Sequence, residues 1–128
     1  MNKRKIVIID DNKDYTLTMG IFLERNGFTV FSANDGKEGI ELIKAERPDL
    51  VLLDVMMEVL FSGFEVCRQV RQDASIKDTP IFGISGMREE INVKFDEDAD
   101  KEYFSPNEFF EKPVDKDALL AKINKYLG

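Results

Sequence analysis

The chain has 128 residues, a length that predicts one compact domain, residues 1–128. It is 43% hydrophobic and carries a formal net charge of -7, which disfavours non-specific binding to nucleic acid or anionic membrane and favours metal cations or basic proteins. With no histidine and one cysteine, the usual zinc sites, histidine-based triads and an internal disulfide are excluded. No apolar run approaches the roughly 18 residues of a membrane span, so a cytoplasmic location is expected.

Strand and helix signals alternate from one end of the chain to the other. Continuous apolar runs predict five strands, at residues 5–11, 28–32, 49–54, 80–85 and 109–113. Apolar residues at helical spacing predict five helices, marked in turn by Tyr15, Thr18, Met19, Phe22 and Leu23; by Gly39, Ile40 and Ile43; by Val66, Cys67 and Val70; by Ile91 and Phe95; and by Leu119, Leu120, Ile123 and Leu127. Such alternation predicts an α/β fold with a five-stranded parallel sheet of order 2-1-3-4-5 and helices on both faces.

Cap and breaker residues mark where several helices begin and end. Gly27 is placed to cap the end of the first helix, and the second helix must end before Pro48. Asp115 is placed to cap the start of the last helix. The fourth helix has the weakest pattern, because its two apolar residues, Ile91 and Phe95, are followed directly by an acidic run.

Polar residues stand at the ends of four predicted strands: Asp10 and Asp11, Asp54, Ser85 and Lys112. Taken singly, they have ordinary alternative roles as a helix cap, a turn residue, a loop hydroxyl and a surface charge. In an open α/β sheet, however, ligands bind beyond the carboxyl ends of the strands, and strands one and three are neighbours in the expected order. The three carboxylates would then converge and repel one another, so the cluster predicts a hard divalent cation, with Mg²⁺ the obvious candidate.

Five motifs, spread over nearly the whole chain, together carry a family resemblance. They are IIDDN at 8–12, LLDVMM around Asp54, the helix start GFEVCRQVR, Ser85 followed by Gly86, and EKPV at 111–114. Jointly they resemble the receiver domain of two-component response regulators, of the kind typified by the chemotaxis regulator with its flavodoxin-like, doubly wound fold. The resemblance implies a signalling module that is not a turnover enzyme and that catalyses only its own phosphorylation and dephosphorylation.

The resemblance implies a phosphoacceptor beside a metal site. Asp54 would accept the phosphoryl group from a histidine kinase or a histidine phosphotransfer protein. Asp11 would bind Mg²⁺ directly, Asp10 would act largely through water, and Met56 would supply its backbone carbonyl to the metal.

The resemblance also implies a switch. Ser85 would hydrogen-bond a phosphoryl oxygen, Lys112 would pair with the phosphoryl group, and Phe109 would occupy the aromatic switch position. Movement of Ser85 toward the phosphoryl group would make room for Phe109, and this would reshape the face of helix four, strand five and helix five where a downstream partner docks. The bond between Lys112 and Pro113 is expected to be cis.

Two regions depart from the family pattern. In the 58–62 loop, Glu58 stands where a proline is usual, and the loop is one residue longer. The segment from Ser85 to Lys112 is also longer, and its acidic part at 96–108 is interpreted either as a partner surface or lid, or as a solvated loop. Because helix four has few apolar residues, residues 88–105 are expected to exchange their amide hydrogens first.

Two other functions remain as alternatives. A pseudo-receiver would bind a partner without phosphorylation, but it would usually lack an acidic or lysine position, and none is missing here. A phosphohydrolase of the haloacid dehalogenase kind would carry a DxD motif, whereas the adjacent acids of this chain are followed by Asn12.

Overall fold

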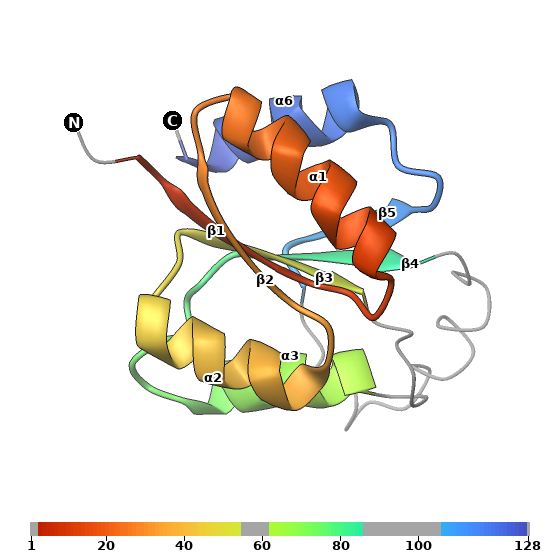
Figure 1. Ribbon diagram of the computed structural model, residues 1–128. Coiled ribbons are helices and arrows are strands. Elements are labelled where there is room, and N and C mark those ends of the chain that lie inside the picture. Colours follow the sequence, from red (N-terminus) through yellow and green to blue (C-terminus); the bar gives the residue numbers. More distant parts are fainter. Residues whose placement is uncertain (1–2, 55–61, 86–105, 128) are drawn as a thin grey trace.

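The computed structural model describes residues 3–54, 62–85 and 106–127. Within these ranges, five parallel strands form one sheet in the order β2-β1-β3-β4-β5, which confirms the predicted topology. Helices α1 and α6 cover one face of this sheet, and α2 and α3 cover the other (Figure 1). The predicted fourth helix, Met56, Glu58 and the acidic segment up to residue 105 lie outside the described residues.

Strands and helices alternate as predicted from β1 to β4, and the helix predicted between β4 and β5 falls in the segment that the structure does not describe. The strands are β1 Lys5–Ile9, β2 Thr29–Ala33, β3 Leu50–Asp54, β4 Ile81–Ser85 and β5 Glu108–Glu111. The helices are α1 Lys13–Arg25, α2 Gly36–Glu46, α3 Ser62–Gln72 and α6 Lys116–Leu127.

The central strands are buried on both faces, and their side chains divide between two cores. Ile6 and Ile8 of β1 pack in the cluster that includes residues of α1 and α6, whereas Val7 and Ile9 pack with residues of α2 and α3. This division follows from the alternation of side chains along a strand. Because the last four residues of β1 and the first four residues of β3 are entirely apolar, polar side chains reappear only at the carboxyl ends of these strands.

Local hydrogen bonds confirm two of the predicted helix caps. At the end of α1, Gly27 has a φ of 95° and donates its N–H to the Glu24 carbonyl at 3.1 Å, while Phe28 donates to Leu23 at 3.2 Å. This is a Schellman motif, in which glycine avoids the strain of a left-handed conformation. At the start of α6, the Asp115 carboxylate accepts from the backbone N–H groups of residues 117 and 118 at 3.0 and 3.2 Å.

The limits of the five strands differ from the predicted stretches by one or two residues. β1 ends at Ile9, and β5 ends at Glu111, which is the partner of Ser85 in the last step of the β4–β5 register. β2 begins one residue later than predicted, at Thr29. Asp10, Asp11 and Lys112 therefore follow the strands, whereas Glu111 is the last residue of β5. The predicted cis peptide bond between Lys112 and Pro113 is confirmed.

Candidate functional site

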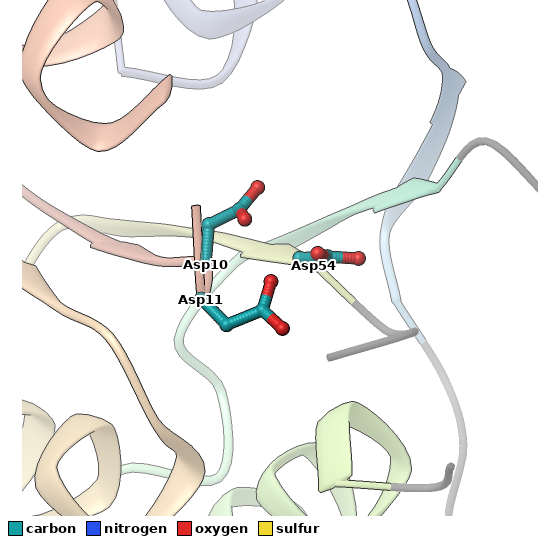
Figure 2. A group of neighbouring side chains, drawn as sticks. All are labelled: Asp10, Asp11 and Asp54. Carbon is teal, nitrogen blue, oxygen red and sulfur yellow. The ribbon is translucent and has the colours of Figure 1, made fainter. Parts of the chain in front are cut away.

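Three carboxylates meet at the carboxyl end of the sheet, as the sequence predicts. Figure 2 shows Asp10 and Asp11 just beyond β1 and Asp54 at the end of β3. The register of the two strands, which pairs Ile9 with Leu53, brings Asp10 beside Asp54. One oxygen from each carboxylate lies within 4.8 Å of the others. Asp10 and Asp54 are buried, at 1% and 4% exposure, whereas Asp11 is exposed to solvent.

Hydrogen bonds fix Asp10 on both its backbone and its side chain. Its N–H donates to the carbonyl of Ala33 at 3.1 Å, and its carbonyl accepts from Asn34 Nδ2 at 2.8 Å. Its Oδ1 accepts from the N–H of Asn12 at 2.9 Å. Residues at the end of β2 and at the start of α1 therefore hold Asp10 in place. In the sequence, Asn34 looks like an ordinary loop residue, and its contact with Asp10 follows only once the β1–β2 pairing is known.

Lys112 lies against the two buried carboxylates. Its Nζ is 2.9 Å from Asp10 Oδ2 and 3.6 Å from Asp54 Oδ2, and its side chain is 29% exposed. Burial by itself would lower the pKa of Lys112, but the hydrogen bond to Asp10 and the negative charges of Asp54 and Asp10 raise the pKa above its ordinary value. The ammonium is therefore charged at neutral pH and offsets part of the negative charge of the cluster.

Tyr15 is a further residue at the site, and the sequence analysis treated it only as an apolar position of the first helix. The Nζ of Lys112 lies over its ring, 4.7 Å from the ring centroid. Its hydroxyl is buried and has no hydrogen-bond partner among the described residues. Burial, followed by the charges of Asp10 and Asp54, raises the pKa of Tyr15 to about 12. The available signal was its position in the first turn of the helix that follows the acidic pair.

The remaining predicted site residues are described in part. Ser85 is the last residue of β4, next to β3, but its side chain lies outside the described parts of the structure, as does Met56. Phe109 is half-buried in β5 and packs against the core between the sheet and α2 and α3. Phe109 thus packs in the core, and its switch role stays a prediction.

The chemistry and the size of the carboxylate cluster both suit a hard divalent cation. All three groups are carboxylates, and only one ammonium, that of Lys112, pairs with them among the described residues. Opposite ligands of Mg²⁺ are about 4.2 Å apart, close to the 4.8 Å limit of the cluster. The site could therefore hold Mg²⁺ through some carboxylates directly and through others by way of water.

The comparison with known families identifies the class of protein. A family model described as the response regulator receiver domain matches residues 6–124, so the chain belongs to this family. The chain is therefore a receiver domain of two-component signalling. Receiver domains bind Mg²⁺ at an acidic pocket, and this chain has a cluster of three carboxylates at the corresponding end of its sheet. Such domains are regulatory rather than classical enzymes, and they interact with histidine kinases or phosphotransfer proteins. Neither alternative function is favoured.

Individual relatives support this assignment. Protein PilH of Pseudomonas aeruginosa is 32% identical over 127 residues, which cover 97% of this chain and 98% of that protein. The regulatory protein PhoP of Bacillus subtilis, named for alkaline phosphatase synthesis, is 39% identical over 92 residues, which cover 72% of this chain and 37% of PhoP. The structure of chemotaxis protein CheY4 of Vibrio cholerae matches the fold with a TM-score of 0.83 at 23% identity, covering 98% of this chain and 99% of that one.

Within the described part of the chain, no helix has the length and apolar character needed to cross a membrane.

Proposed function

We propose that Asp54 takes up one phosphoryl group from a histidine kinase or a histidine phosphotransfer protein, with Mg²⁺ as cofactor, in a cytoplasmic signalling pathway. The observation that carries this proposal is the buried Asp54 carboxylate, which has two further carboxylates within 4.8 Å and the Lys112 ammonium at 3.6 Å. A nucleophile, a cation and a set of metal ligands thus share one end of the sheet.

The proposed reaction needs positioning and charge neutralisation more than covalent chemistry. An oxygen of Asp54 attacks the phosphorus atom, and a new O–P bond forms. The N–P bond of the phosphohistidine donor breaks, and its electron pair returns to the imidazole nitrogen. Lys112 offsets negative charge on the phosphoryl oxygens, and bound Mg²⁺ would offset more of it. Asp10 and Asp11 would hold the metal, with Asp10 acting largely through water.

Three further residues complete the proposed site and switch. Ser85 ends β4 beside Asp54, so its hydroxyl would hydrogen-bond a phosphoryl oxygen, and the backbone carbonyl of Met56 would contribute to the metal site. Phe109 would respond to the movement of Ser85. Its ring lies beside Gly83, where a Cβ atom would be 3.5 Å away, so the ring packs against β4 itself. A change at the end of β4 can thus reach β5 by direct contact.

The downstream partner would bind at the face formed by the predicted fourth helix, β5 and α6. Here α6 is the helix predicted as the fifth. Of the acidic residues in the 96–108 segment, Glu108 lies within the described residues. Its carboxylate accepts a hydrogen bond from Tyr126 Oη at 2.7 Å and lies 3.6 Å from Lys122 Nζ. Glu108 therefore joins β5 to α6, and the acids at 96–102 would supply the charge that attracts a partner.

Intact-protein mass spectrometry tests the proposal. With acetyl phosphate and Mg²⁺, the chain should gain the mass of one phosphoryl group, and it should gain none in EDTA. Asp54→Asn should abolish the uptake and Lys112→Ala should slow it. A matched control is Asp14→Asn, because Asp14 is an exposed acid in the first turn of α1, and this variant should react like the wild type. Uptake that persists in Asp54→Asn or in EDTA would show that the proposal is wrong.

A further inference from the structure

The Lys112 ammonium lies over the ring of Tyr15 as well as against the two buried carboxylates. The ammonium is 2.9 Å from Asp10 and 3.6 Å from Asp54, and the Tyr15 ring centroid lies 4.7 Å away. An ammonium over an aromatic face is attracted by the ring quadrupole, more strongly where water is excluded. We propose that Tyr15 is a positioning residue for phosphoryl transfer, and that its ring holds Lys112 in place against the acidic pair.

The same turn of the chain orients Tyr15 and Asp10. Asn12 donates its N–H to Asp10 Oδ1 at 2.9 Å, and its side-chain oxygen accepts from the Tyr15 N–H at 3.1 Å. The ring and the carboxylate that confine the lysine are thus tied to a single residue, which also caps α1. This arrangement positions the backbone of Tyr15, from which the ring extends, relative to the Asp10 carboxylate.

The ring, and not the hydroxyl, makes the contact with Lys112. The hydroxyl is buried and has no hydrogen-bond partner among the described residues, so its removal loses no hydrogen bond seen in the structure. A phenylalanine at this position would keep an aromatic face toward the ammonium. The inference therefore predicts that Tyr15→Phe retains the positioning effect and that an aliphatic residue loses it.

The chain contains a matched control for this contact. Phe22 also lies on α1, also packs partly buried against the core shared with α6, and also has a lysine over its ring, with Lys116 Nζ 5.8 Å from the centroid. No residue of the acidic cluster takes part in that pair. Phe22→Leu thus removes a similar aromatic contact from the same helix without touching the site.

The experiment measures the rate of phosphorylation by acetyl phosphate at saturating Mg²⁺. The role of Tyr15 rests on the proposed function of Lys112. Tyr15→Leu should slow the reaction roughly 3- to 30-fold, while Tyr15→Phe and Phe22→Leu should stay within about twofold of the wild type. In a Lys112→Ala background, Tyr15→Leu should have no further effect, because Tyr15 acts through the lysine. Thermal unfolding checks that each variant is folded, and Tyr15→Met replaces Tyr15→Leu if the latter does not fold.

The outcomes separate this inference from the proposed function. If Lys112→Ala slows phosphorylation but Tyr15→Leu does not, the proposed role of Tyr15 is wrong and the proposed function stands. The same holds if Tyr15→Leu slows phosphorylation equally with and without the lysine. A Tyr15→Phe variant as slow as Tyr15→Leu would likewise overturn it, because the hydroxyl would then be the active group. If Lys112→Ala reacts at the wild-type rate, the proposed role of the lysine fails and the inference fails with it.

Discussion

Replacing Asp54 by asparagine should stabilise the metal-free protein, although it removes the proposed phosphoacceptor. Asp54 is 4% exposed, has the carboxylates of Asp10 and Asp11 within 4.8 Å, and has the Lys112 ammonium at 3.6 Å. At a separation of 4.8 Å, the repulsion of the Asp54 carboxylate by Asp10 and by Asp11 is about 0.9 to 3.5 kcal/mol each, for an effective dielectric constant of about 80 to 20. The attraction to Lys112 at 3.6 Å is about 1.2 to 4.6 kcal/mol on the same scale. The two repulsions outweigh the attraction to Lys112, so the charges of these four residues together predict a net gain of about 0.5 to 2.5 kcal/mol.

Urea denaturation followed by circular dichroism measures this gain. In EDTA, Asp54→Asn should raise the free energy of unfolding by the amount given above, and Asp14→Asn, at an exposed position outside the cluster, should change it little. Saturating Mg²⁺ should stabilise the wild type more than Asp54→Asn, because a bound cation relieves the same repulsion. If Asp54→Asn were less stable than the wild type in EDTA, the carboxylates would not repel one another as this geometry requires.

Three further predictions concern packing, alkaline pH and partner binding. A Cβ at Gly39 would lie 2.5 Å from Ile9 Cδ1, so Gly39→Ala should destabilise the chain by roughly 1 to 3 kcal/mol. Gly20→Ala should not destabilise it, because a Cβ there would have its nearest neighbour at 3.6 Å. Equal urea midpoints for the two variants would contradict this prediction. Because folding raises the pKa of Tyr15 from 10.0 to about 12, its contribution to stability is complete below pH 10 and is lost as the pH rises through about 12. Tyr15→Phe should therefore flatten the pH dependence of unfolding in that range, and an unchanged profile would refute the assignment. Neutralising the acidic residues of segment 96–108 should weaken partner binding and make that binding less dependent on salt concentration. Surface plasmon resonance measures both effects, and the absence of both would count against a partner surface.

The sequence was sufficient to predict the sheet order and the acidic cluster. Asp10 and Asp54 each follow an uninterrupted apolar run, and parallel strands end at the same edge of the sheet, so adjacency of β1 and β3 was enough to bring them together. The strand limits were less predictable, because the sequence does not show where the hydrogen-bonded ladder stops: Lys112 directly follows the last paired residue of β5 and already lies in a bend.

The sequence did not reveal the residues that act on the site from a distance along the chain. Tyr15 fits a helical apolar pattern whether it lies over a leucine or over an ammonium, and only the position of Lys112 in three dimensions distinguishes the two. Asn34 reaches Asp10 because β2 lies beside β1, and its own neighbours in the sequence give no sign of that contact. Local patterns predict elements, whereas such contacts depend on tertiary packing.

Borohydride trapping of the phosphorylated protein tests the central claim most directly. Reduction converts an acyl phosphate on an aspartate to homoserine, and peptide mass spectrometry then locates the modified residue. After treatment with acetyl phosphate and Mg²⁺, the modification should be found at Asp54, next to the Lys112 ammonium and the other two carboxylates. Omission of Mg²⁺ should abolish it. Homoserine at Asp10 or Asp11 in place of Asp54, or no trapped product at all, would contradict the assignment of Asp54 as the phosphoacceptor.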